Sequence, residues 1–167
     1  MNLRDSTIED RDLPSALARG ARQWAEGSGT RVDIDFAGSA RKLPEEVELN
    51  IFRIAQEAVT NALKYAGASA IQIGLRVEHH RLELTVDDDG RGFDASGAFA
   101  MRNGHYGLLG MRERAEHMGG LMELTTGPTG GTVVKVTVPL SPQKNLDQPG
   151  WRRLAGFIKT LRGPLIP

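Results

Sequence analysis

The chain has 167 residues, enough for one domain with a substantial core, and its 21 basic residues balance 21 acidic ones. This balance gives no argument for a nucleic-acid partner, and we expect none. The chain contains no cysteine, which excludes disulfides, thiolate metal sites and cysteine nucleophiles. No apolar run approaches the roughly 18 residues that span a bilayer, and the N-terminus lacks a signal-peptide pattern, so the sequence favours a cytoplasmic domain.

The first part of the chain predicts a helix, a strand and a second, longer helix. Residues 1–12 are polar and read as a leader or linker, and an apolar face over residues 13–25 predicts the first helix. Apolar residues alternate over residues 32–36, which predicts a short strand. The longest predicted helix begins at a proline and covers residues 44–65.

The helix predicted over residues 44–65 has one apolar side and one polar side. Its polar side carries Glu57, Asn61 and Lys64, which follow each other at i, i+4 and i+7. A carboxylate, an amide oxygen and an ammonium group in one column can serve a Mg²⁺ ion and a polyphosphate. A merely solvated helix face is the alternative, and this helix alone does not decide between the two.

Two alternating runs, residues 71–77 and 82–86, predict an antiparallel pair of strands joined by a hairpin turn. The second strand ends in three aspartates, residues 87–89, which are followed by Gly90 and Gly92. A run of carboxylates costs strand propensity and repels itself, so it needs a reason. A carboxylate held at a strand end beside glycines can accept a hydrogen bond from a ligand amine, and a solvated acidic turn is the alternative.

Residues 94–106 are small, contain glycine and lack a periodic pattern, which predicts a mobile loop. Glycines at positions 104, 107 and 110 then lead into a helix predicted over residues 111–118. Spaced glycines at the N-terminus of a helix expose unpaired backbone N–H groups, which suit phosphate oxygens.

Two further strands, residues 121–126 and 132–140, are joined by a glycine-rich hairpin. The order of helices and paired strands favours an α+β fold, a two-layer sandwich with helices packed on one sheet face. We expect one globular domain over residues 13–140, followed by a tail over residues 141–167. The tail combines an apolar stripe with basic residues, so it is either an amphipathic helix that can contact an anionic membrane or a partner, or a disordered appendage.

Other ligand motifs do not fit the sequence. Gly90-x-Gly92-x-x-Ala95 matches the dinucleotide fingerprint superficially, but no helix or βαβ unit follows it. The chain has no G-x-x-x-x-G-K-[ST] phosphate loop, and a calcium loop around the aspartates would place its bidentate carboxylate at Ser96. The histidines lack the spacing of metal ligands; they are His79, His80, His105 and His117.

Three ordered motifs instead resemble those of the ATP-binding domain of sensor histidine kinases, whose nucleotide-binding fold is shared with gyrase, Hsp90 and MutL. Residues 52–66 (FRIAQEAVTNALKYA) resemble the N box, residues 88–93 (DDGRGF) the G1 box and residues 107–115 (GLLGMRERA) the G2 box. Gly131 and Thr132 match the closing strand signature. The similarity is closest to the group whose response regulators carry NarL-type DNA-binding domains. It implies the Bergerat fold, with a mixed five-stranded sheet and about three helices on one face.

The resemblance implies that the chain binds ATP with Mg²⁺. Asp88 would accept a hydrogen bond from the adenine amino group, and Gly90 and Gly92 would let the base and a lid approach. Asn61 would ligate the Mg²⁺ that bridges the phosphates. Residues 94–106 would form the ATP lid.

The resemblance also implies phosphate contacts. Lys64 and Tyr65 would contact phosphate oxygens, although this kinase group usually has histidine at the position of Tyr65. Thr132 would support the phosphate end, and Glu57 would either activate water, as in ATP-hydrolysing relatives, or orient the Mg²⁺ shell or the acceptor. Backbone N–H groups of the G2 box would also bind phosphate; the residues are Gly107, Leu108, Gly110 and Met111.

Histidine kinases phosphorylate a histidine on a preceding dimerising helical hairpin, and no such segment is recognisable here. The resemblance therefore implies the catalytic part alone, which would serve the phosphoacceptor domain of the same or a partner kinase and, downstream, a response regulator. We expect good ATP binding but poor phosphoryl transfer, which depends chiefly on positioning the acceptor. The alternatives are an ATPase acting through Glu57, a serine-kinase anti-sigma relative, and a nucleotide-binding module without catalysis. The location would be the cytoplasm, free or as the cytoplasmic part of a membrane-bound sensor.

Overall fold

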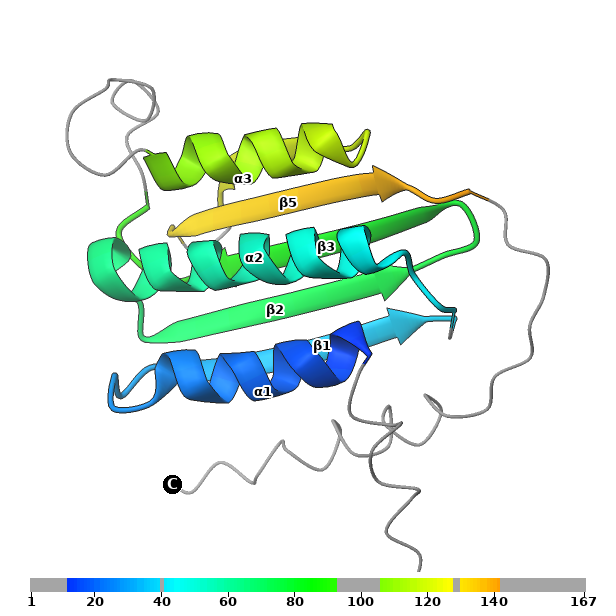
Figure 1. The fold of residues 1–167 in the computed structure, drawn as a ribbon. Helices are drawn as coiled ribbons and strands as arrows, with labels where there is room; N and C mark the ends of the chain where they lie inside the picture. The colour runs from blue at the N-terminus through cyan, green and yellow to red at the C-terminus, as the bar shows by residue number, and fades with distance from the viewer. Residues whose placement is uncertain (1–11, 40, 93–105, 128–129, 142–167) are drawn as a thin grey trace, which may run out of the picture.

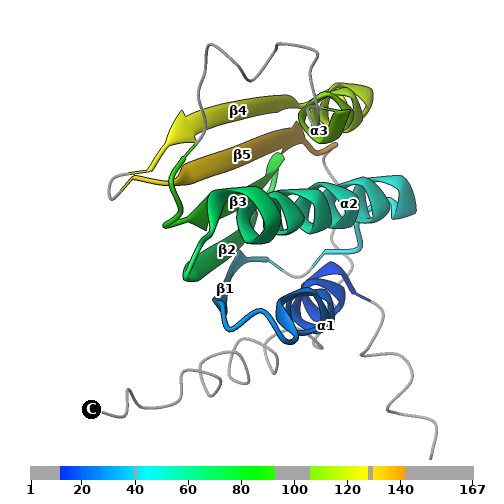
Figure 2. The ribbon, with the colours of Figure 1, turned by 90° about the vertical axis from the view of Figure 1, so that its left-hand side faces the viewer.

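The computed structural model describes residues 12–39, 41–92, 106–127 and 130–141. Within these ranges three α-helices lie on one face of a five-stranded sheet, as Figures 1 and 2 show from two directions. The helices are α1 (Leu13–Ala25), α2 (Glu45–Asn61), which continues as the π-helical turn η2 (Ala62–Ala66), and α3 (Tyr106–His117). The strands are β1 (Arg31–Gly38), β2 (Ala70–Val77), β3 (Arg81–Asp88), β4 (Leu121–Thr126) and β5 (Thr132–Pro139).

The strands follow the order β1-β2-β3-β5-β4 across the sheet. β1 and β2 are parallel, and every other neighbouring pair is antiparallel. A parallel pair needs a crossover connection, which α2 provides between β1 and β2. The predicted α+β sandwich with a mixed five-stranded sheet is therefore confirmed.

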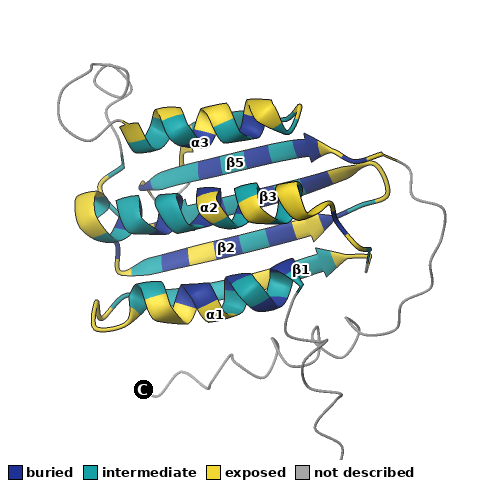
Figure 3. Cartoon of the chain, in the orientation of Figure 1, coloured by how far each residue is buried: buried dark blue, intermediate teal, exposed yellow. Residues whose placement is uncertain are grey.

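The core lies between the helices and the sheet, as Figure 3 shows by the buried residues along α2 and the strands beneath it. The strands present alternate side chains to this layer, and Ile73, Leu84 and Val136 are fully buried there. The apolar side predicted for the long helix is confirmed by its buried residues, which are Ile51, Ile54, Ala55, Ala58 and Val59.

The opposite face of the sheet is polar. On β3 the residues between the buried positions are half-buried, and Glu83 forms an ion pair with Lys135 of β5, with 3.1 Å between Oε2 and Nζ. An antiparallel sheet with one packed and one solvated face shows this alternation. The helix-covered side therefore holds the core and, at its edge, the predicted site.

Two helix boundaries differ from the prediction. The long helix remains an α-helix only to Asn61 and then widens into the π-helical turn η2. Helix α3 begins at Tyr106 rather than near residue 111. Its early start follows from Leu108, which packs against the core one turn before the buried Met111, so the apolar spacing of the helix already begins there.

Candidate functional site

The predicted site residues gather where α2 ends, at the left of Figure 1. Lys64 lies in η2 and is exposed, and Tyr65 beside it is 57% exposed. The turn closes on Gly67, which has a left-handed backbone (φ 61°) and donates its N–H to the carbonyl of Ala62. Single π-helical turns within helices occur frequently at functional sites.

Asp88 is the last residue of β3 and points to the helix-covered side of the sheet, where only 7% of it is exposed. The backbone N–H of Gly90 donates to its Oδ1 at 2.8 Å, and the backbone N–H of Thr132 also donates to this carboxylate. Burial raises the pKa of Asp88, and these two hydrogen bonds offset part of that rise. A buried acceptor backed by two backbone donors can receive a hydrogen bond from a ligand amine.

The neighbouring aspartates have different roles. Asp89 is exposed and accepts hydrogen bonds from the N–H groups of Ser69 (2.8 Å) and Ala70 (2.9 Å) and from the Ser69 hydroxyl, which hold its pKa below the ordinary value. It ties the end of β3 to the start of β2. Asp87 lies on the polar face of the sheet, where partial burial raises its pKa.

The glycines around Asp88 permit close backbone contacts. A Cβ at Gly90 would lie 2.7 Å from the carbonyl oxygen of Ala66, at the end of η2. A Cβ at Gly131 would overlap the Asp88 carbonyl, and Gly92 has a left-handed backbone (φ 75°). The three segments that build the site therefore approach each other more closely than side chains would allow.

Helices α2 and α3 meet at Glu57 and Gly107. A Cβ on Gly107 would overlap Oε1 of Glu57 and lie 2.9 Å from its Cδ, so the carboxylate occupies the space that the glycine leaves. Within the described part of the chain, no hydrogen bond or ion pair forms to the Glu57 carboxylate. Its place at the N-terminus of α3 is electrostatically favourable, because that end of a helix carries partial positive charge.

The first turn of α3 also contains Leu108, and N–H groups of a first turn have no acceptor within their helix. Gly110 and Met111 lie further along, where N–H groups donate to the carbonyls four residues earlier. Only Gly107 and Leu108 among the four predicted G2 residues thus keep backbone donors for a phosphate. Met111 contributes instead to the core, where it is fully buried.

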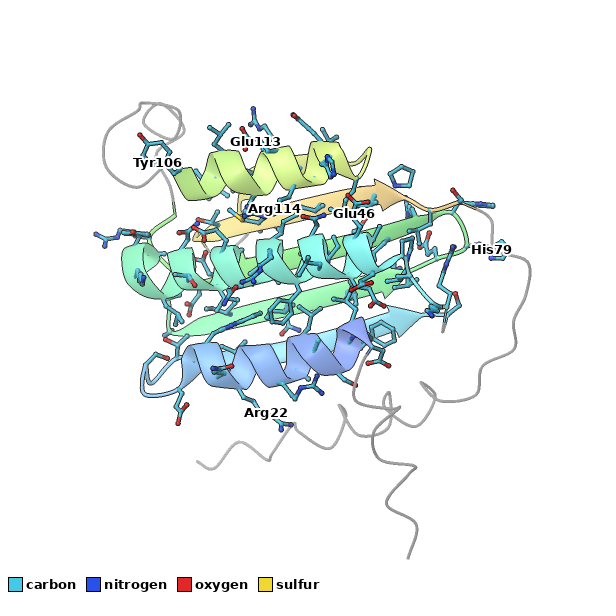
Figure 4. The ribbon with its side chains drawn as sticks, in the orientation of Figure 1. Arg22, Glu46, His79, Tyr106, Glu113 and Arg114 are labelled. Carbon is cyan, nitrogen blue, oxygen red and sulfur yellow. The ribbon has the colours of Figure 1, made fainter. Side chains whose placement is uncertain are left out.

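Figure 4 shows the outer residues of α3, with Tyr106 at the start of the helix and Arg114 on the side toward α2. The Arg114 side chain lies back along the helix toward Gly110. A Cβ on Gly110 would be 2.9 Å from one of the terminal nitrogens of Arg114. The sequence did not single out this arginine.

Thr132 was expected at the phosphate end of the site. Its backbone N–H donates to the Asp88 carboxylate, which is the predicted adenine acceptor, and its role at the phosphate end stays a prediction. The residue is half-buried at the start of β5.

Asn61 lies at the end of α2 and is half-buried, one turn after Glu57 on the same side of the helix. No group of three or more histidine, aspartate or glutamate side chains among the described residues has the arrangement of a metal site. A Mg²⁺ ion prefers few protein ligands together with substrate phosphates and water, which fits a single amide ligand at Asn61.

Other residues that the sequence analysis named lie outside the described residues or away from this site. The lid residues up to 105, including His105, and the tail after residue 141 lie outside the described residues. His79 and His80 are exposed in the β2–β3 turn, and His117 pairs with Glu46 at 2.7 Å between Nε2 and Oε1. No described helix is both long enough and apolar enough to cross a membrane.

Comparisons with known proteins agree on one family. The family model described as "Histidine kinase-, DNA gyrase B-, and HSP90-like ATPase" matches residues 46–142. The chain is 29% identical to the signal transduction histidine-protein kinase/phosphatase DegS of Brevibacillus brevis, over 86% of the chain and 36% of DegS. It is 31% identical to the oxygen sensor histidine kinase NreB of Staphylococcus carnosus, over 84% of the chain and 40% of NreB. The chain thus spans about two fifths of these relatives.

Solved structures support the same fold. The histidine kinase domain of the blue-light activated histidine kinase of Erythrobacter litoralis EL346 superposes with a TM-score of 0.60 at 27% identity, covering 77% of this chain and 61% of that one. The ATP binding domain of PrrB from Mycobacterium tuberculosis superposes with a TM-score of 0.59 at 23% identity, covering 77% and 93%. The second likeness shows the fold alone.

Proposed function

Because the chain belongs to the family of histidine kinase-, DNA gyrase B- and HSP90-like ATPases, we propose that it binds ATP with Mg²⁺ and supplies the γ-phosphoryl group for histidine phosphorylation in two-component signalling. One observation supports this proposal above the others. Of three consecutive aspartates, only Asp88 is buried, and backbone N–H groups from two other positions of the chain hold its carboxylate. A buried acceptor of this kind discriminates strongly for a ligand that donates a hydrogen bond.

The nucleotide would span the distance from β3 to α3. Asp88 would accept a hydrogen bond from the adenine amino group, with Gly90 leaving room for the base. Lys64 and Tyr65 would contact phosphate oxygens, and both are exposed in η2. The free N–H groups in the first turn of α3, beginning with Gly107, would add donors and a favourable helix dipole.

Asn61 would hold the Mg²⁺ together with phosphate oxygens and water. When bound, the ion neutralises phosphate charge as the phosphoryl group leaves. Glu57, one turn earlier, is within reach of the same region because it lies against Gly107. Its carboxylate would orient the Mg²⁺ hydration shell or the incoming acceptor.

The acceptor histidine would come from a phosphoacceptor domain of the same protein or of a partner kinase, and a response regulator would receive the phosphoryl group. The relatives named as histidine kinases are more than twice as long as the matched segment, which leaves room for such a domain in them. We place the activity in the cytoplasm, where ATP is available.

A second candidate function is ATP hydrolysis without an acceptor protein. It is favoured by the Glu57 carboxylate, to which no described residue forms a hydrogen bond or ion pair, since an unpaired carboxylate can act as a general base on water. Phosphate release from ATP by the chain alone, lost in Glu57→Gln, would favour this candidate over the kinase.

The test of nucleotide binding is a titration of the chain with a fluorescent ATP analogue, with and without Mg²⁺. We expect Asp88→Asn to weaken binding by about 100-fold, because the amide accepts more weakly and presents N–H groups that oppose the adenine donor. Asp35→Asn is the matched control, since Asp35 is exposed on β1. Equal affinity of the Asp88→Asn chain and the wild type would refute the assignment of the adenine site.

A further inference from the structure

Arg91 joins the turn after β3 to the last turn of α2. Its side-chain Nε donates to the carbonyl oxygen of Tyr65 at 2.8 Å, and its backbone N–H donates to the carbonyl oxygen of Ala66 at 3.0 Å. Both acceptors belong to the π-helical turn η2. Two hydrogen bonds from one residue therefore connect the segment that carries Asp88 to the segment that carries Lys64.

The carbonyl groups at the end of a helix have no partner within the helix and carry partial negative charge. An arginine is well suited to them, because its donors are charged and held in a rigid plane. Gly90 supports the contact, since its missing side chain lets the turn approach Ala66. Arg91, between Gly90 and Gly92, therefore contacts η2 from outside the helix.

Lys64 and Tyr65 extend from η2 and are exposed, so packing does not fix them. Two hydrogen bonds from Arg91 act on their backbone, in addition to the packing of Ala62 in the core. We propose that Arg91 is a positioning residue for the phosphate half of the nucleotide site, which holds η2 so that Lys64 and Tyr65 meet the polyphosphate. This proposal rests on the proposed nucleotide binding and adds to it a residue that acts through others.

Positioning by Arg91 has two alternatives, direct attraction of phosphate and simple stabilisation of the fold. The guanidinium is exposed and positively charged, so it can attract phosphate directly. It can also contribute only to stability, as a cap on α2. If Arg91 attracts phosphate directly, ATP affinity depends on its positive charge. If it only stabilises the fold, its loss changes the affinity for every ligand equally or for none. If it positions η2, ATP affinity depends on a hydrogen-bond donor at the place of Nε.

Substitutions at Arg91 separate these three roles because of their geometry. In Arg91→Gln the amide nitrogen follows the same number of side-chain carbons as Nε does in arginine, so the donor is kept and the charge is removed. Arg91→Lys keeps the charge but moves the donor one bond further out. Arg91→Met removes both. Arg81→Met is the matched control, because Arg81 is an exposed arginine at the other end of β3 whose Nε bonds Glu78 at 2.9 Å.

The measurement is the dissociation constant of Mg-ATP and of adenosine for each variant of the full chain. We expect Arg91→Met to weaken ATP binding by about tenfold, the effect of one lost hydrogen bond of ordinary strength, with adenosine binding unchanged. Arg91→Gln should restore ATP affinity to within about threefold of the wild type and Arg91→Lys should restore less. Hydrogen exchange at the amides of residues 63–67 should quicken in Arg91→Met and not in Arg91→Gln.

Three results would overturn the proposal. If Arg91→Lys binds ATP like the wild type while Arg91→Gln resembles Arg91→Met, the charge itself contacts phosphate. If ATP and adenosine weaken equally, Arg91 supports the fold or the adenine site. If Arg91→Met behaves like Arg81→Met, the contact with η2 has no role in binding. A wild-type chain that binds neither ligand would instead refute the proposed function, so the two failures are distinguishable.

Discussion

The two ends of the sheet are built in different ways. At the end with the β2–β3 turn, to the right in Figure 1, hydrogen bonds join separate segments of the chain, although the buried Nε of Arg41 has no partner among the described residues. The guanidinium of Arg41 donates to the carbonyls of His79 (2.9 Å) and Ser141 (2.8 Å), and the Leu140 N–H donates to the His80 carbonyl at 2.7 Å. The other end holds the buried carboxylate of Asp88, the exposed Lys64 and the glycines around Asp88.

This difference separates contacts that join segments of the fold from the groups of the proposed site. The end with the β2–β3 turn fastens that turn, the end of β5 and the loop before α2 to each other. The site end keeps a carboxylate buried at a cost, as the raised pKa of Asp88 shows, and leaves Glu57 without a polar partner among the described residues. Functional sites commonly retain such costs, so substitutions at the two ends should have opposite consequences.

The largest effect should come from the contact between Glu57 and Gly107, as a difference between two backgrounds. Gly107→Ala should destabilise the wild type by about 1 kcal/mol, at the low end of the cost of overpacking, because the flexible carboxylate end of Glu57 must move away from the new Cβ. In a Glu57→Ala background the obstacle is gone, and the same substitution should stabilise α3 by up to about 1 kcal/mol through helix propensity. Thermal unfolding of the four chains measures this change of sign.

The same double-mutant cycle also shows which result would contradict the predicted coupling between Glu57 and Gly107. Equal effects of Gly107→Ala in both backgrounds would mean that Glu57 moves aside without cost and that the two helices are not coupled through this pair.

A smaller effect is expected at the end with the β2–β3 turn. Arg41→Met should lower the free energy of unfolding by about 1–2 kcal/mol, because two carbonyl groups lose their donor, and should leave ATP affinity unchanged. Chemical denaturation and the nucleotide titration measure the two quantities, with Arg76→Met on the exposed side of β2 as the control. A change in ATP affinity would show that the two ends are not independent.

The smallest effect is a pH dependence. Since burial raises the pKa of Asp88, this carboxylate takes up a proton at a higher pH than an ordinary aspartate does. Adenosine affinity should therefore fall as the pH is lowered from neutrality, and the fall should begin at a higher pH than an ordinary aspartate would set. Adenosine is used because it lacks phosphates that titrate. The Asp88→Asn chain should show no such dependence, and a flat wild-type profile would contradict the role of this carboxylate.

Stability should change in the opposite direction. The folded chain binds the Asp88 proton more tightly than the unfolded chain, so the contribution of this group to stability is present at low pH and is lost as pH rises through its raised pKa. Asp88→Asn should thus raise the Tm at neutral pH, and the gain should shrink on acidification. Calorimetry at several pH values measures it.

The sequence predicted the family, the two-layer fold and the two-faced long helix, all of which are confirmed. These features depend on periodic apolar residues and on short motifs, which can be read from neighbouring residues in the sequence. The choice of Asp88 among the three aspartates came from the resemblance to the G1 box, and the structure buries Asp88 and exposes Asp89. The roles of the site residues toward ATP and Mg²⁺ remain predictions.

The sequence did not predict what depends on contacts between distant segments. The π-helical turn η2 forms hydrogen bonds with Arg91, which lies 26 residues after Tyr65. No local sequence pattern predicts this contact. The predicted start of α3 is too late because the glycine pattern puts Gly107 and Gly110 before the helix, whereas packing of Leu108 and Met111 on the core extends the helix through them. Tertiary contacts outweighed local propensity in both cases.

The position of β5 between β3 and β4 also has a consequence for the order in which the molecule is completed. Thr132, whose backbone N–H donates to Asp88, begins β5, which follows the other four described strands in the chain, although Asp88 itself lies more than forty residues earlier. A nascent chain that ends before β5 lacks one of the two backbone donors to its predicted adenine acceptor. Nucleotide binding would therefore report the insertion of β5 between β3 and β4, a long-range and hence slow step of folding.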